Sequence, residues 1–103
     1  PASKGHALIL PKEHYANLYE LDDKIAEKVL VLAKQMVTKL TDILGCDGYN
    51  IIQNNGIVAG QSVFHYHMHL IPRYKEDTVD IKWELGNLTD KDKEYILKKM
   101  NEK

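Results

Sequence analysis

Three histidines occupy alternate positions near the centre of the chain, at His65, His67 and His69. Successive side chains of a β-strand point to opposite faces, so this spacing places all three imidazoles on one face of a strand. On a helix the same positions would spread around the axis and could not share one site. The opposite, apolar face would be formed by Phe64, Tyr66, Met68 and Leu70. We therefore expect a strand over residues 63–71, ended by Pro72, that carries a row of imidazoles at a surface or cleft.

A long amphipathic helix is predicted from about Asp22 to Leu44, because apolar residues recur there every three or four positions. Asp22 or Asp23 would cap its start, and Gly45 stands just past its end. The stripe expected to face the core consists of Ile25, Val29, Leu32, Met36, Leu40 and Ile43.

Shorter elements complete the predicted fold. Residues 6–10 and 49–54 have the composition of short strands bounded by turn residues. The connection from the second strand to the histidine strand has about six residues, which favours an antiparallel hairpin over a parallel crossover. Residues 73–88 lack a periodic pattern, with Trp83 as their one large anchor. Thr89 then opens a capping box before a short final helix.

These elements place the chain in the α+β class: an antiparallel sheet with a long amphipathic helix packed on one face and a short C-terminal helix. The length suits a single domain over residues 1–103 with one modest core. A net charge of −1 provides no attractive field for nucleic-acid polymers or anionic membranes, and no apolar run has transmembrane length. Cys46 is the only cysteine, which suits a reducing cytoplasm.

The histidine row admits three functions, of which metal binding is the first. Neutral imidazole suits zinc, copper or iron, so a metal-dependent hydrolase could use the row as ligands. However, strand residues two apart are separated by about 6.5 Å at Cα and those four apart by about 13 Å, so three rarely meet one ion. No Asp or Glu lies between Gly48 and Arg73 to complete such a site.

Nucleophilic catalysis by an imidazole is the second function. A neutral ring nitrogen attacks phosphorus, forms a phosphoryl- or nucleotidyl-imidazole and is later displaced by water. The flanking histidines can bind phosphate oxygens or transfer protons near neutral pH. Donors for a phosphate stand just before the strand at Gly60, Gln61 and Ser62, and Asn54 would reach the same region across the hairpin. The third function, a nucleotide-binding module without turnover, would use the same pocket.

The segment 65–72 resembles the signature of the histidine triad (HIT) family, in which three alternate histidines are followed by apolar residues. The likeness extends to residues 5–14, to Asn54 and to residues 60–63, and so covers nearly the whole chain. The Pro-Arg ending of the signature is most similar to bacterial HIT-type nucleotide hydrolases. The resemblance implies a hydrolase or transferase that cleaves purine nucleotide conjugates, either dinucleoside polyphosphates or nucleoside phosphoramidates, at the α-phosphate.

The resemblance also implies a role for each site residue. His67 would be the nucleophile, and His69 would contact the α-phosphate and the bridging atom. His65 would orient the site together with His6, and Ser62 would assist the leaving group. The residues implied to bind the substrate are Asn54, Gly60, Gln61, Ser62 and His69.

Three further expectations come from the same resemblance. Family members are usually homodimers, and their catalysis requires no cofactor. The family normally has an additional N-terminal segment with a β-hairpin and a helix, so a HIT-like domain in this sequence is expected to be incomplete at its N-terminus. In many bacterial members that segment holds a Cys pair that binds zinc with two histidines. His14 and His65 match those ligands, and because no Cys pair accompanies them a structural zinc is expected to be weak or absent.

Overall fold

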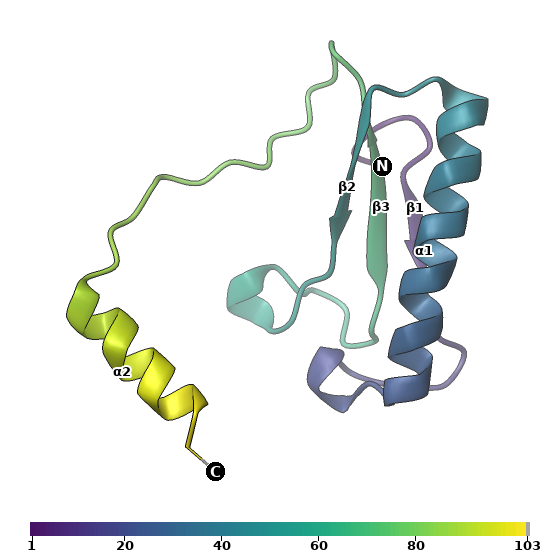
Figure 1. Ribbon diagram of the computed structural model, residues 1–103. Coiled ribbons are helices and arrows are strands. Elements are labelled where there is room, and N and C mark those ends of the chain that lie inside the picture. Colours follow the sequence, from purple (N-terminus) through teal and green to yellow (C-terminus); the bar gives the residue numbers. More distant parts are fainter. Residues whose placement is uncertain (103) are drawn as a thin grey trace.

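A computed structural model describes residues 1–102, which form a small antiparallel sheet with a long helix against one face (Figure 1). The strand order is β1-β3-β2, so β3, the strand that contains His69, is central. The elements along the chain are β1 (Ala7–Ile9), η1 (Leu18–Glu20), α1 (Asp23–Leu44), β2 (Gly48–Ile52), η2 (Ile57–Ala59), β3 (Met68–Arg73) and α2 (Asp90–Met100). The predicted α+β class, the antiparallel hairpin and both helices are confirmed. No helix among these described residues is long and apolar enough to cross a membrane.

Helix α1 begins and ends where the sequence predicts. The Asp22 carboxylate accepts hydrogen bonds from the backbone N–H groups of Lys24 and Ile25, which have no partner within the first turn of a helix. Gly45 ends the helix with φ = 61°, a left-handed conformation that glycine adopts without steric cost, and its N–H bonds to the carbonyl of Thr41.

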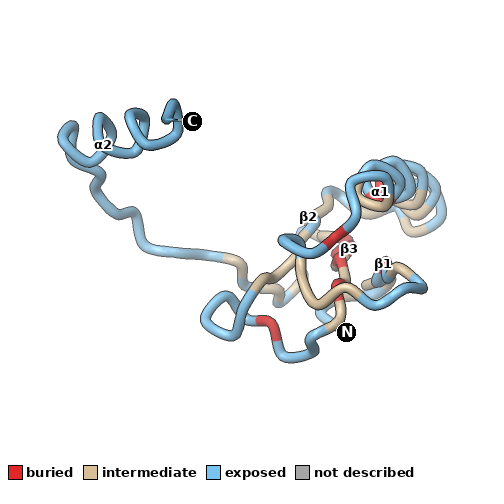
Figure 2. The backbone as a smooth tube through the Cα atoms, turned by 90° about the horizontal axis from the view of Figure 1, so that it is seen from below, coloured by how far each residue is buried: buried red, intermediate tan, exposed pale blue. Residues whose placement is uncertain are grey.

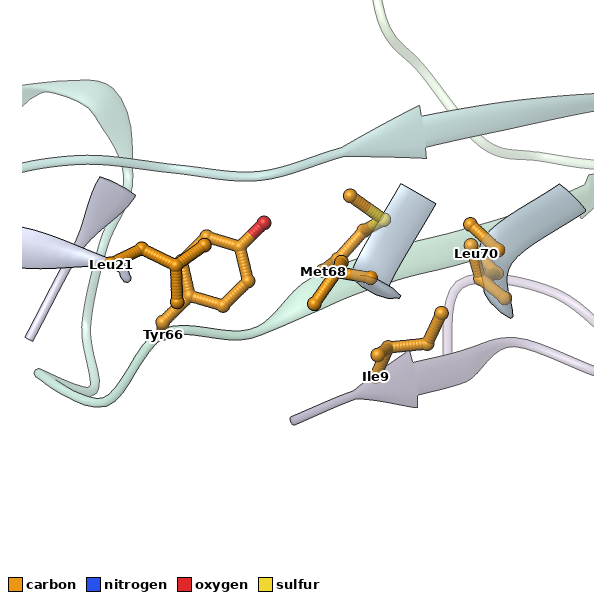
Figure 3. Packing of buried hydrophobic residues seen from close by; sticks show 7 residues of the cluster. Ile9, Leu21, Tyr66, Met68 and Leu70 are labelled. Atoms are coloured by element: carbon orange, nitrogen blue, oxygen red, sulfur yellow. The ribbon is translucent and has the colours of Figure 1, made fainter. Parts of the chain in front are cut away.

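The core lies between α1 and the sheet, where Met68 and Leu70 of β3 pack beside Ile9 of β1 (Figure 3). The α1 side of this core is centred on Val29 and Ala33. The predicted apolar stripe is partly wrong, because Leu32 is 43% exposed and Ile43 is 75% exposed, whereas the small Ala33 is fully buried. Ala33 lies four residues after Val29 and therefore on the same face of α1, the face that packs closely against the sheet.

The histidine strand is shorter than predicted at its start. The ladder of β3 begins at Met68, and only His69 of the three histidines lies within it. Residues 63–65 bend instead, and Phe64 is 51% exposed, so the prediction that it packs inward is wrong. The Tyr66 N–H bonds to the Tyr15 carbonyl, which ties this stretch to the segment after β1. Inward packing does hold from Tyr66 onward.

Pro72 does not end the strand as predicted but lies inside β3, paired in register with Tyr49 of β2. Its carbonyl accepts a hydrogen bond from the Ser3 hydroxyl, on the side of β1. The N and C=O of one strand residue point to the same side, so the backbone nitrogen of Pro72 faces the β1 side as well. At this level the pairing with β1 has not yet begun, since its first residue is Ala7. The proline therefore removes no ladder hydrogen bond.

The C-terminal part is irregular over residues 74–89, as predicted, and is followed by α2. The Thr89 hydroxyl accepts a hydrogen bond from the Asp92 N–H, which confirms the predicted cap. The prediction that Trp83 anchors this part is wrong, because its side chain is 79% exposed. Every described residue of α2 is exposed, and the helix stands apart from the sheet (Figure 2).

Candidate active site

His67 directly precedes β3, and its side chain is held in one tautomer. Its Nδ1 lies 2.8 Å from the carbonyl oxygen of His65, which can only accept a hydrogen bond. Nδ1 therefore carries the proton and Nε2 holds the free lone pair. The partly buried ring is thus oriented by the backbone, with a nucleophilic nitrogen at its far end.

His69, the one histidine within β3, is linked to His6 in a chain of hydrogen bonds. The backbone N–H of Ala2 donates to His6 Nδ1 at 2.9 Å, so the proton of a neutral His6 lies on Nε2. His6 Nε2 in turn lies 2.9 Å from His69 Nδ1, which must accept that bond. His69 therefore carries its proton on Nε2, as a donor. Its ring meets the ring of His67 edge-on with centroids 5.0 Å apart, so a hydrogen-bond donor stands beside His67.

The pKa of His69 lies below its ordinary value of 6.5, first because of burial and then because of the nearby rings of His67 and His6. Burial and the positive N-terminus lower the pKa of His6 in the same direction. Both rings thus favour the neutral form at neutral pH, which the hydrogen-bond chain through Ala2 requires.

Lowered histidine pKa values predict a protein that becomes less stable in mild acid. As the pH falls through about 6.5, the unfolded chain binds protons that the folded His6–His69 pair does not, so the free energy of unfolding decreases until the pH reaches the lowered pKa values. Urea unfolding at about pH 5.5 and about pH 7.5 measures this difference. His69→Asn should reduce it, and an equal decrease in the variant and the parent would contradict the assignment.

His65 faces a different neighbour from the one predicted. Its Nε2 donates to the Pro11 carbonyl at 3.0 Å, and its Nδ1 lies 3.2 Å from Nδ1 of His14. The chain bends over residues 63–65 and turns this ring toward the segment after β1, away from His6, so the expected joint role of His65 and His6 in orienting the site stays a prediction. His65 contributes to the site through its carbonyl, which holds His67.

The His14–His65 pair matches the two histidines expected for a structural zinc. The bond to the Pro11 carbonyl keeps the proton of His65 on Nε2, so its Nδ1 accepts the hydrogen bond from the Nδ1–H of His14. A structural zinc site needs four ligands. Within residues 1–102, no group of three or more His, Cys, Asp or Glu side chains could hold a metal, so this pair supplies half of such a set.

Gln61 is 3% exposed, and all of its side-chain hydrogen-bonding groups are used within the protein. Its Oε1 accepts from the Gly56 N–H at 2.8 Å, and its Nε2 donates to the carbonyls of Ala16 at 2.6 Å and Val63 at 3.1 Å. Its own N–H bonds to the Gly56 carbonyl. In this structure the amide therefore serves a structural role, and the implied contact of Gln61 with the substrate stays a prediction.

Gln61 joins the loop before the histidines to the segment after β1. We expect Gln61→Ala to lower the free energy of unfolding by on the order of 1–3 kcal/mol, because it removes three hydrogen bonds made by a buried side chain. Urea unfolding measures the loss. Ser62→Ala, one residue away and exposed, is the matched control and should change stability little. Equal losses in the two variants would contradict the role of Gln61.

Asn54 and Gly60 lie together, as predicted. A Cβ atom at Gly60 would stand 3.5 Å from Nδ2 of Asn54, and the φ of Gly60 is +97°, a conformation that favours glycine. The bare backbone of Gly60 thus lies against a side-chain amide, with the exposed Ser62 two residues on. The Gly60 N–H is already bonded to the Ile57 carbonyl at 2.9 Å, so the Asn54 amide and the Ser62 hydroxyl are the side-chain donors of this loop.

Other residues that hold the site were missed by the sequence reasoning. The Asn55 Oδ1 accepts from the Leu18 N–H at 2.7 Å, and the Tyr66 N–H donates to the Tyr15 carbonyl. Together with the Gln61 bond to Ala16, these contacts join two segments that are far apart in sequence. Most of the groups are backbone atoms, which leave no signature in residue types; a second Asn beside Asn54 is the one visible signal.

Comparisons with known proteins find one matching family and several relatives. The HIT domain family matches residues 1–76, which include all of the histidines. The adenosine 5'-monophosphoramidase hnt1 of Schizosaccharomyces pombe is 47% identical over 77 residues, which is 75% of this chain and 55% of that protein. The adenosine 5'-monophosphoramidase HNT1 of Candida albicans is 38% identical over 120 residues, 100% of this chain and 76% of that protein. This chain thus spans little more than half the length of several curated relatives.

Solved structures give the same result. The crystal structure of a HIT family protein from Bacillus anthracis superposes with a TM-score of 0.88 at 32% identity, over 96% of this chain and 72% of that chain. A member of the HIT family from Bacillus subtilis gives a TM-score of 0.87 at 36% identity with the same coverage. Both matches extend beyond residue 76, so they include parts of the chain that the family match leaves out.

Proposed function

This chain belongs to the HIT domain family, and from that premise we propose that it cleaves purine nucleotide conjugates at the α-phosphate through a nucleotidyl intermediate on His67. The observation that carries the proposal is the hydrogen bond from His67 Nδ1 to the His65 carbonyl, which leaves Nε2 as the nucleophile. Relatives named adenosine 5'-monophosphoramidase favour a nucleoside phosphoramidate as the substrate class.

The proposed reaction has two displacements at phosphorus. In the first, the Nε2 lone pair of His67 forms a bond to the α-phosphorus, the bond to the leaving nitrogen or oxygen breaks, and that atom takes a proton. In this proposal Ser62 assists the leaving group, while the Nε2–H of His69 donates to the α-phosphate or the bridging atom. In the second, water attacks the phosphorus, the bond to His67 breaks, and a nucleoside monophosphate and a proton are released.

The open face of the sheet offers a place for the purine ring. His69 is paired in register with Leu8 of β1 and Ile52 of β2, and paired residues of neighbouring strands share a face. Leu8 is 50% exposed although it is apolar. An aromatic base laid across these two side chains would cover them and bring its α-phosphate toward His69.

The loop donors should matter for rate without being essential. We expect Ser62→Ala and Asn54→Ala each to slow hydrolysis by about ten- to a hundredfold, since a hydrogen bond to a charged group contributes about 1.5–3 kcal/mol. Steady-state kinetics with an adenosine phosphoramidate measure this. The control is Thr41→Ala, which removes an exposed hydroxyl near the C-terminal end of α1 and should leave the rate unchanged. Unchanged rates in all three variants would show that the loop takes no part in the reaction.

A homodimer in the cytoplasm completes the proposal. Strand β2 is an edge of the sheet, with backbone groups free to pair with another chain. An apolar groove runs beside it, lined by Leu30, Val31, Lys34, Val37, Thr38 and Ile51. A second copy placed along this edge would cover the exposed Leu30 and Val31. The single Cys46 is compatible with a reducing compartment.

Mass spectrometry during turnover tests the reaction. Protein quenched while it hydrolyses an adenosine phosphoramidate should carry an adenylyl group on His67. Activity should survive excess chelator, because no step needs a metal ion. A protein that binds the nucleotide without turnover would support the binding-module alternative. Loss of activity that zinc restores, with the fold intact by circular dichroism, would support a metal-dependent hydrolase instead.

A further inference from the structure

Three amide residues, a glutamine and two asparagines, follow β2 in direct succession at positions 53–55. At the lower end of the sheet in Figure 1, the chain leaves β2 toward η2 and later returns from there to enter β3. The ladder between these strands ends with the pair Ile52 and His69, so Asn54 and His67 each lie two residues past the same end of the sheet. The three amides therefore lie at the end that carries the proposed nucleophile.

The two outer amides bond to each other. Gln53 Nε2 donates to Asn55 Oδ1 at 2.9 Å, and Asn55 Nδ2 donates back to Gln53 Oε1 at 2.8 Å. Each partly buried side chain thus offers its donor to the acceptor of the other. This arrangement, called here the Gln53–Asn55 pair, fixes both side chains together, because neither can turn unless both hydrogen bonds break.

The Gln53–Asn55 pair is anchored at two further points. Asn55 Oδ1 also accepts from the backbone N–H of Leu18 at 2.7 Å, which ties the pair to the start of η1. Gln53 Nε2 also donates to the backbone carbonyl of Asn54 at 3.2 Å. The first contact holds the pair in place relative to the segment after β1. The second restrains the peptide group that follows the Cα atom of Asn54.

Asn54, between the two, keeps its side-chain amide for another partner. Among the hydrogen bonds within residues 1–102 none uses that amide, which lies against the bare backbone of Gly60. In an extended segment, side chains two residues apart share one side and the residue between them points to the other. Since Gln53 and Asn55 meet on one side, the Asn54 amide points away from their pair. One amide of the three is therefore available to a substrate, and the other two are engaged within the protein.

We propose that Gln53 and Asn55 are positioning residues, whose pair holds the backbone of Asn54 so that the Asn54 amide is aligned for the phosphate of the substrate. The inference rests on the proposed function, in which Asn54 binds the substrate, and adds two residues that act through Asn54 without touching the substrate. A hydrogen-bond donor that is held in place before binding stabilises its ligand more strongly, because less conformational freedom is lost when the ligand arrives.

A double-mutant cycle tests the positioning role. Gln53→Met keeps the length of the side chain and removes its hydrogen bonds. We expect it to lower kcat/KM for an adenosine phosphoramidate by about three- to tenfold in the parent, but by less than about twofold in Asn54→Ala, where no amide is left to align. Gln35→Met, the same replacement at an exposed position of α1, is the matched control and should leave kcat/KM unchanged in both backgrounds.

The affinity for adenosine monophosphate, measured by calorimetry, provides a second readout that does not depend on turnover. The same cycle should show the same coupling between Gln53 and Asn54. Circular dichroism checks that each variant is folded under the conditions of the assay. If Gln53→Met does not fold, Gln53→Glu takes its place, since a carboxylate still accepts from Asn55 Nδ2 but cannot donate to the Asn54 carbonyl. The added charge is present in both backgrounds and therefore cancels in the cycle.

Two results would overturn the positioning role and leave the proposed function standing, provided that the parent forms the adenylyl adduct on His67. Losses by the same factor in the parent and in Asn54→Ala would show that Gln53 supports the fold and does not act through Asn54. No loss in either background would show that the Asn54 amide needs no alignment. Conversely, coupling in the affinity for adenosine monophosphate without any turnover would refute the proposed hydrolysis and support the positioning role. A parent that neither binds nor hydrolyses these nucleotides would overturn both.

Discussion

Replacing His67 by alanine is expected to abolish hydrolysis of an adenosine phosphoramidate while leaving the fold and nucleotide binding largely intact. Removal of Nε2 eliminates the covalent route, so the rate should fall by more than the roughly 10²–10⁴-fold that a general acid or base contributes. The ring is only partly buried and lies outside the core, so little packing is lost. Single-turnover kinetics measure the rate, and calorimetry with a nucleoside monophosphate measures the binding.

His67→Asn separates a chemical role of this residue from a structural one. An asparagine amide can still donate to the His65 carbonyl in place of Nδ1–H, but it provides no nucleophile. We therefore expect His67→Asn to be as inactive as His67→Ala and closer to the parent in stability. Hydrolysis by either variant at near the parental rate would refute the nucleophile assignment.

Leu70→Ala is expected to have the largest effect on stability. Leu70 is fully buried at the centre of the middle strand, where it packs between α1 and the sheet. Truncation of such a side chain removes buried apolar surface and leaves a cavity, at a cost of about 2–5 kcal/mol. For a domain of this size that is a large share of the total stability. Urea or thermal unfolding followed by circular dichroism measures the change.

Leu8→Ala is the matched control for Leu70→Ala. Both are leucines of the same sheet, but Leu8 lies on the face that carries His69 and is 50% exposed. We expect it to change the free energy of unfolding by less than about 1 kcal/mol. If Leu8 lies beneath the purine ring, the same variant should weaken nucleotide binding. Equal losses of stability in the two variants would contradict the placement of the core on the α1 side.

The core residues and the residues of the proposed active site therefore lie on opposite faces of β3. Met68 and Leu70 point toward α1 and hold the sheet to the helix (Figure 3). His69, between them in sequence, points to the open face and meets His6 and His67. The two-residue period of a strand produces this division, because neighbouring residues face opposite sides.

The sequence alone determined the features that depend on local patterns. Helix α1 was predicted to within a residue because Asp22 and Gly45 cap it through groups that lie a few positions away. The class, the antiparallel hairpin and the outward side of the histidines follow from periodicity and connection length. The involvement of His6, His67 and His69 in one site was likewise indicated, since the histidine spacing and the family resemblance point to the same residues.

Only the tertiary structure decided which partner each residue in and around the site has. His65 meets His14, Gln61 bonds to Ala16, and Pro72 fits within a central strand. Each of these results depends on a segment far away in sequence, and often on its backbone carbonyls, which every residue type supplies alike. The C-terminal part of the chain is the clearest case. The sequence suggested Trp83 as its anchor, but whether an apolar side chain packs depends on a surface supplied by another part of the fold, and Trp83 is exposed. Local sequence thus encodes where elements begin and end, while the long-range contacts settle how the imidazoles are oriented.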